Sequence, residues 1–134
     1  MTMKMFETKR LPGEWDEIAP DSSKVRKLLA LEGGSMAHFE LPAGDTSIAE
    51  SHRTVGEIWY FLSGRGEMWR KAGDQEEIVE VEPGVCLTIP VGTAFQFRSF
   101  GDESLTAIGA TTPPWPGEDE AIAVPGKWSS GTRE

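Results

Sequence analysis

The sequence predicts an all-β domain built as a barrel or sandwich of many short strands. Fifteen glycines and nine prolines are many for 134 residues, and they fall between short apolar runs. Turn residues at this density are typical of all-β chains. About nine short strands fit this spacing, which favours closure into a barrel or a two-sheet sandwich. The length fits a single domain, 1–134, that buries its core without disulfide bonds.

The first barrel segment, 24–31, is compatible with two structures. A serine at 22 or 23 could cap a helix there, whereas alternating apolar residues and the Gly33-Gly34 turn favour a hairpin with 36–41. We prefer the hairpin because every later segment has the pattern of a strand. The expected later strands are 47–53, 57–62, 67–71, 76–82, 85–89, 94–99 and 104–110.

The two ends of the chain are expected to lie outside a barrel that spans 24–110. Residues 1–20 form an irregular arm whose Phe6, Trp15 and Ile18 could pack onto the barrel. Residues 111–134 contain four prolines, so we expect an extended tail that is packed back by its tryptophans. The acidic residues 118–120 within it are predicted to form a mobile turn.

Composition excludes several classes of partner. The net charge of −9 disfavours binding to nucleic acid and to anionic membrane surfaces. The longest run of large apolar residues, 58–62, is too short to span a bilayer, and the N-terminus has no secretory h-region. The lone cysteine, Cys86, fits a reducing compartment. These features predict a cytoplasmic protein.

The segment GDTSIAESHRTVGEIWYFLSG, 44–64, carries the candidate chemistry. Alternate residues of a strand share a face, so Glu50 and His52 should project together. If the chain turns at 54–56 and returns as a strand, Glu57 joins them. One imidazole and two carboxylates suit a divalent ion such as Mn, Fe, Ni or Zn. The alternative is a metal-free cluster in which carboxylate repulsion raises one pKa and creates a general acid or base.

The spacing within this segment resembles the first motif of the cupin family. Gly44, Glu50, His52, Glu57 and Gly64 stand where that motif has a glycine, a His-x-His pair, a glutamate and a closing glycine. The second motif is matched by Gly84 and by Pro-Val-Gly at 90–92. The resemblance covers 36–110 and implies a double-stranded β-helix, the jelly-roll barrel of cupins.

The resemblance also implies where a metal would be bound. Typical metallocupins use three histidines and one glutamate, and the matching positions here are Glu50, His52, Glu57 and Phe95. The first histidine is replaced by a carboxylate and the last by a phenylalanine, so the metal motif is degenerate. We therefore expect Glu50, His52 and Glu57 as metal ligands if an ion is bound, and no organic cofactor.

Aromatic residues are expected to form the wall of a substrate pocket beside these polar groups. Phe95 and Phe97 share one strand face, and Trp59 and Phe61 share another. An apolar wall with a few convergent polar groups is typical of small-molecule sites. We expect a small, partly apolar ligand such as a carboxylate or a hydroxy-ketone. His38 should point outward, because Ala37 and its alternate neighbours form the better core face.

Two classes of function fit these patterns. The first is a metal-dependent isomerase, lyase or decarboxylase in which Glu57 and His52 are catalytic. The second is a metal-free cupin that binds a small ligand as a carrier, sensor or accessory domain. Whether the chain is an enzyme is therefore left open. Strand 57–62 is apolar on both faces, which predicts a homodimer that covers the outer one.

Overall fold

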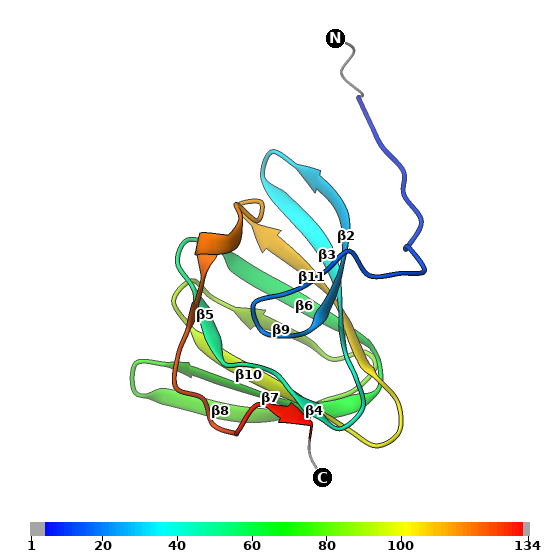
Figure 1. Cartoon of the computed structure of the whole chain (residues 1–134). Coiled ribbons are helices and arrows are strands. Elements are labelled where there is room, and N and C mark those ends of the chain that lie inside the picture. The colour runs from blue at the N-terminus through cyan, green and yellow to red at the C-terminus, as the bar shows by residue number, and fades with distance from the viewer. Residues whose placement is uncertain (1–4, 133–134) are drawn as a thin grey trace.

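The computed structural model describes residues 5–132, which form a jelly-roll barrel of two antiparallel sheets (Figure 1). One sheet has the order β1-β2-β3-β11-β6-β9. The other has the order β12-β5-β10-β4-β13, and β7 and β8 extend it from β10. The strands are β1 (Glu17–Ile18), β2 (Lys24–Leu31), β3 (Gly34–Leu41), β4 (Asp45–Thr46), β5 (Glu50–His52), β6 (Gly56–Ser63), β7 (Arg65–Ala72), β8 (Gln75–Val81), β9 (Cys86–Ile89), β10 (Ala94–Phe100), β11 (Leu105–Thr112), β12 (Ala121–Ala123) and β13 (Gly131–Thr132).

The predicted hairpin is confirmed, since β2 and β3 pair in antiparallel register across a tight turn. Only β5 forms within the predicted strand 47–53. A separate short strand, β4, precedes it, and both pair with β10. The turn between β6 and β7 depends on Gly64, which has a φ of +78°. A side chain at Gly64 would also collide with the backbone of Ser104, so both conformation and space require glycine.

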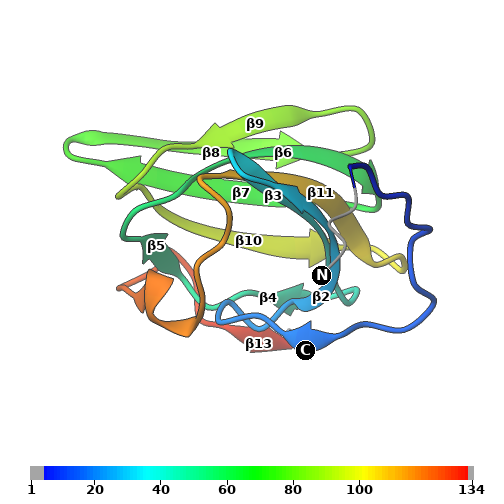
Figure 2. The ribbon, with the colours of Figure 1, turned by 90° about the horizontal axis from the view of Figure 1, so that it is seen from above.

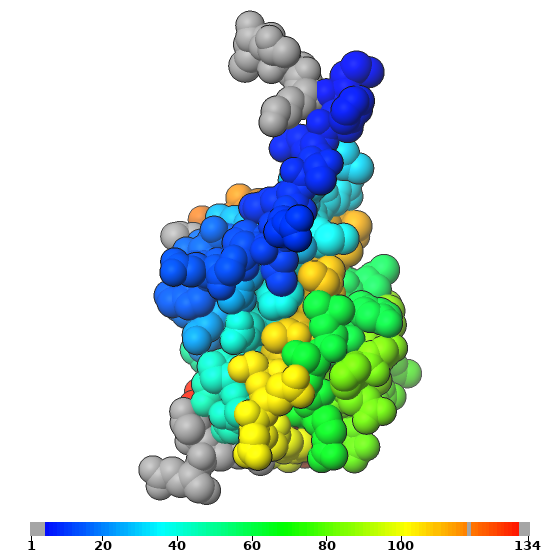
Figure 3. All heavy atoms as spheres, turned by 90° about the vertical axis from the view of Figure 1, so that its right-hand side faces the viewer, coloured from blue at the N-terminus to red at the C-terminus, as the bar shows by residue number. Residues whose placement is uncertain are grey.

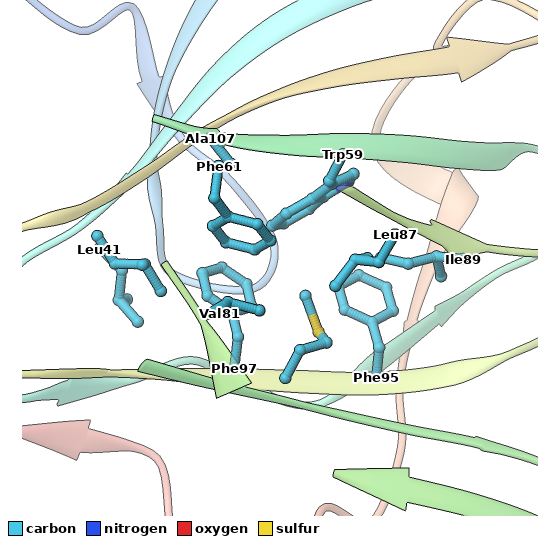
Figure 4. Close-up of a cluster of buried hydrophobic side chains, with 11 residues drawn as sticks. Leu41, Trp59, Phe61, Val81, Leu87, Ile89, Phe95, Phe97 and Ala107 are labelled. Atoms are coloured by element: carbon cyan, nitrogen blue, oxygen red, sulfur yellow. The ribbon is translucent and has the colours of Figure 1, made fainter. Parts of the chain in front are cut away.

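The core lies between the two sheets. In Figure 4, Trp59 and Phe61 of β6 extend from one sheet toward Phe95 and Phe97 of β10 in the other. Leu41, Met68, Val81, Leu87, Ile89, Leu105 and Ala107 complete this buried cluster. The alternation of β6 explains the arrangement, because Glu57, Trp59 and Phe61 point inward while the residues between them are exposed.

The C-terminal tail is tied to the barrel more firmly than the sequence suggested. A 3₁₀ turn, η1 (Glu118–Glu120), leads into β12, which lies beside β5 at one end of the barrel (Figure 2). The expectation of a mobile acidic turn was wrong. Glu120 is buried and accepts hydrogen bonds from the Thr54 and Val55 amides and the Thr54 hydroxyl.

The N-terminal arm packs less than expected. Residues 17–18 pair with β2 as β1, but the segment before them runs along the β2–β3 hairpin and extends away from the barrel (Figure 3). Phe6 is 86% exposed, and Trp15 and Ile18 are also exposed, so the expected packing of these side chains was wrong. The arm instead binds the charged side chain of Arg26, because the Pro12 and Gly13 carbonyls accept hydrogen bonds from its guanidinium.

The outer face of β6 is uncovered. Ile58, Tyr60 and Leu62 are 53%, 49% and 43% exposed. Ile108 and Ala110 of β11 stand opposite Tyr60 and Ile58 on the same face. None of the helices in the described part of the chain is long and apolar enough to cross a membrane.

Candidate functional site

A cavity of about 340 Å³ opens between the barrel interior and the β2–β3 hairpin. Its inner end is polar and contains Asp21, Glu50, His52 and Glu57. Its walls are mainly apolar and come from β2, β3, β6, β10 and the start of the tail, including Val25, Leu28, Ala37, Phe39, Trp59, Phe95, Pro114 and Trp115. This volume is ample for a small organic molecule, since a cavity of about 150 Å³ holds benzene.

The structure brings the three predicted polar residues together. Glu50 and His52 share a face of β5, and His52 Nε2 lies 3.2 Å from Glu50 Oε1. Glu57 enters from the start of β6, and its Oε1 lies 4.0 Å from His52 Nδ1. All three are buried. His52 Nδ1 is buried and has no hydrogen-bond partner within the described residues.

The carboxyl group of Glu57 already has two partners. Its Oε1 accepts from the Trp59 indole at 2.9 Å, and its Oε2 accepts from the Thr111 hydroxyl at 2.9 Å. Trp59 is in turn stacked on Phe39, with ring centroids 4.7 Å apart. A side chain at Gly109 would strike the Phe39 ring, so glycine leaves room for this stack. Glu57 therefore orients one aromatic wall of the cavity.

Asp21 is a site residue that sequence reasoning missed. It lies in the loop between β1 and β2, is only 2% exposed, and accepts hydrogen bonds from the amide and hydroxyl of Ser23. Ser22 between them has a φ of +80°, a conformation that non-glycine residues rarely adopt. The only local signal was the Asp-Ser-Ser turn, which does not show that the loop reaches the barrel interior.

Burial makes the carboxyl groups of this cluster weak acids. Desolvation, together with the charge of Glu50, raises the pKa of Asp21 to about 7. Desolvation and the charge of Glu57 raise the pKa of Glu50 to about 8. Burial also raises the pKa of Glu57, although the charge of His52 and the hydrogen bonds that Glu57 accepts from Trp59 and Thr111 oppose this shift. Groups with a pKa near neutrality can hold or release a proton at working pH.

The arrangement does not fit the predicted metal site. Among residues 5–132, no three His, Cys, Asp or Glu side chains are placed to hold an ion. Glu50 and Glu57 face different nitrogens of the His52 ring, whereas a metal is bound through one nitrogen. Both Glu57 oxygens are also engaged as acceptors. A metal at these residues would require Glu57 to leave its present partners.

The aromatic lining of the cavity matches the expected set only in part. Trp59 and Phe95 line the cavity, but Phe61 and Phe97 lie in the core and are not among the described lining residues. Trp115 takes part instead, with its ring edge-on to the His52 imidazole at a centroid distance of 5.0 Å. Its amide donates to the Ser35 hydroxyl of β3, which fixes the tail across this side of the cavity.

His38 points away from the barrel interior as expected, but its ring is buried rather than open to solvent. It is 5% exposed, and its Nδ1 has no partner within the described residues. Its strand neighbour Arg26 is held over this face by Glu40 and the Pro12 carbonyl. Burial, and then the charge of Arg26, lower the pKa of His38.

The fold agrees with comparisons to known proteins. The model of the Cupin domain matches residues 37–109, and the chain belongs to this family. It is 33% identical over 131 residues to the uncharacterized protein MJ1618 of Methanocaldococcus jannaschii, an alignment that covers 91% of this chain and 98% of that protein. Cupin domains often bind a metal, but the described residues contain no group that is arranged to hold one.

Solved structures share the fold at low sequence identity. KdgF from Halomonas sp. is 15% identical, with a TM-score of 0.65 over 80% of this chain and 94% of that chain. Oxalate decarboxylase from Bacillus subtilis is 16% identical, with a TM-score of 0.69 over 81% of this chain and 29% of that chain. The Cnp3 cupin domain of Schizosaccharomyces pombe is 16% identical, with a TM-score of 0.60 over 67% of this chain and 64% of that chain. These similarities show the fold alone.

Proposed function

We propose that this chain is a small-molecule-binding cupin that holds a compact, partly apolar ligand directly with its side chains. One observation carries the proposal. An apolar-walled cavity of about 340 Å³ ends at His52, whose Nδ1 is buried without a hydrogen-bond partner among the described residues. A buried polar atom without a partner is costly, and a bound ligand would satisfy it.

The cavity supports this proposal by its shape and its chemistry. Phe95, Trp59 and Trp115 supply apolar contact area, while Glu50 and Asp21 supply groups that can hold a proton. Such a site binds and orients a ligand without an ion between protein and ligand. A carrier, sensor or accessory domain needs no more than this. The two carboxyl groups with a pKa near neutrality also favour a second candidate, an acid–base enzyme that acts on the same ligand.

Metal-dependent catalysis, the other function expected from the sequence, keeps its support from the family motif at Glu50, His52 and Glu57. It would require Glu57 to break its hydrogen bonds to Trp59 and Thr111. Elemental analysis of the purified, untagged protein and of His52→Ala tests it. Near-stoichiometric metal that is lost in the variant would favour the metal-dependent function over our proposal.

Thermal-shift screening of small molecules against chelator-treated protein tests the proposal itself. Stabilising compounds should lose their effect in Ala37→Leu, because Ala37 lines the cavity and the added carbons fill it. Ala72→Leu makes the same change at an exposed position of β7 that is not among the described lining residues, and it should respond like the wild type. Compounds that stabilise both variants equally, or none that stabilise the wild type, would contradict the proposal.

A further inference from the structure

The ionisable groups that line the cavity are mainly acidic. Asp21, Glu50 and Glu57 surround His52 at the inner end, and their side chains are buried. Within the described lining residues, Lys27 is the one lysine or arginine, and it is exposed at the mouth, where its Nζ lies 3.4 Å from Glu17 Oε1. An anionic ligand would therefore meet three carboxyl groups and no buried cation.

The aromatic walls of the cavity are suited to a positively charged ligand. Phe95 and Trp115 both lie edge-on to the His52 ring, with centroids 5.2 and 5.0 Å away, and Trp59 forms a further part of the lining. Aromatic rings attract cations, most strongly where water is excluded. A cation at this position would also favour the ionised form of these carboxyl groups, which burial disfavours.

A second feature of the site points to a ligand that donates a hydrogen bond. His52 is 4% exposed, its Nε2 contacts Glu50, and its Nδ1 is unpartnered in the described part of the chain. An ammonium N–H could donate to this nitrogen or to a neighbouring carboxylate oxygen. Asp21 belongs to the same cluster, and its loop is tied to the barrel by the Ile48 amide, which donates to the Asp21 carbonyl.

We infer that the preferred ligand is a small organic cation, an amine or ammonium with an apolar body, whose charged group lies among Asp21, Glu50 and His52 and whose body contacts the aromatic wall. This inference rests on the proposed function, because it specifies the ligand of the same cavity. It differs from the carboxylate or hydroxy-ketone that the sequence led us to expect.

Calorimetric titration with benzylamine, benzyl alcohol and benzoate tests the inference, because the three share a ring and differ in charge. Near neutral pH and after treatment with a chelator, benzylamine should bind at least about tenfold more tightly than benzyl alcohol, and benzoate should bind most weakly. Asp21→Asn should weaken the binding of benzylamine by about tenfold more than that of benzyl alcohol. Measurable binding of benzyl alcohol would show that the variant keeps its cavity, and equal losses for the two compounds would contradict the inference.

The outcomes separate this inference from the proposed function. Benzyl alcohol or benzoate that binds as tightly as benzylamine would overturn the preference for a cation and leave the binding function standing. Benzylamine that binds Ala37→Leu as well as the wild type would place it on the acidic surface, and the inference would fail. If none of the three probes binds, the inference fails, and the screen with Ala37→Leu then decides the proposed function separately.

Discussion

The ring of Phe95 lies edge-on to the imidazole of His52, with centroids 5.2 Å apart and planes inclined at 74°. Phe95 also stands opposite Glu50 in the pairing of β10 with β5. Phe95, at the position where the cupin resemblance implies a metal-binding histidine, therefore contacts His52. We expect from this contact that a single substitution can supply a further ligand.

Phe95→His should create metal affinity that the wild type lacks or holds weakly. The new imidazole would stand beside His52 and Glu50, which supplies a third donor that does not depend on Glu57. Titration with Ni, Zn or Mn should show binding at least about tenfold tighter than in the wild type. Phe97→His is the matched control, because Phe97 lies on the same face of β10 but in the core. Equal metal binding by the wild type, the variant and the control would contradict this geometry.

Stability should fall as pH rises from about 5 to about 8. The pKa of Asp21 is raised from 3.8 to about 7 and that of Glu50 from 4.5 to about 8, so the folded state holds protons that the unfolded chain releases. The contribution of these two groups to the free energy of unfolding is fully present below their ordinary pKa values and is lost as the pH rises through the raised values.

Glu50→Gln should remove part of this dependence. The melting temperature at about pH 8 should rise by several degrees, corresponding to a gain on the order of 2 kcal/mol, with little change near pH 5. Glu80→Gln removes an exposed carboxyl from β8 and should leave the pH dependence of the wild type. A wild-type melting temperature that rises steadily over this range would contradict the assignment of raised pKa values.

Trp115→Ala should weaken ligand binding by about tenfold, because Trp115 contacts His52 and lines the cavity. Trp128→Ala is the matched control from the same tail. Trp128 packs against Arg98, with the guanidinium 4.1 Å from its ring centroid, and is not among the described residues that line the cavity. Calorimetry with any compound found in the screen measures the affinity of both variants for the ligand. Equal losses in the two variants would mean that the tail acts only by holding the fold together.

The exposed outer face of β6 should mediate a homodimer. It carries Ile58, Tyr60 and Leu62 beside Ile108, and these side chains carry no charge although the chain has a net charge of −9. A second copy can meet this patch without bringing like charges together at its centre. Light scattering should report a dimer for the wild type and a monomer for Ile58→Glu.

Ile78→Glu is the matched control for the dimer, since Ile78 is an exposed isoleucine on β8 of the other sheet. It should leave the oligomeric state unchanged. A monomeric wild type at high concentration, or a dimer that survives Ile58→Glu, would contradict the assignment of this face.

The sequence predicted those parts of the fold and site that depend on local pattern. Alternation along β5 placed Glu50 and His52 on one face, and the short turn before β6 brought Glu57 to them. The predicted aromatic lining of the pocket was less accurate, because alternation separates inside from outside but does not distinguish cavity wall from core. Phe61 lies in the core for this reason, although it shares its face with Trp59.

The parts that were missed depend on contacts between distant segments. Asp21 reaches the cavity because Ile48 donates its amide to the Asp21 carbonyl and ties the loop to the barrel. Trp115 reaches His52 because the tail is held by Ser35 and, further along, by Glu120. No spacing within a single strand encodes such contacts, so one sequence could not reveal them.

Histidine-selective ¹⁵N NMR in the presence of a chelator tests the central claim most directly, because the chain has only two histidines. His52 lines the cavity, whereas His38 lies on the opposite face of its sheet and serves as an internal reference. A ligand from the screen should shift the imidazole signals of His52 and leave those of His38 in place. A shift at His52 that appears only after metal is added, or no shift at a ligand concentration that stabilises the protein, would contradict direct binding in this cavity.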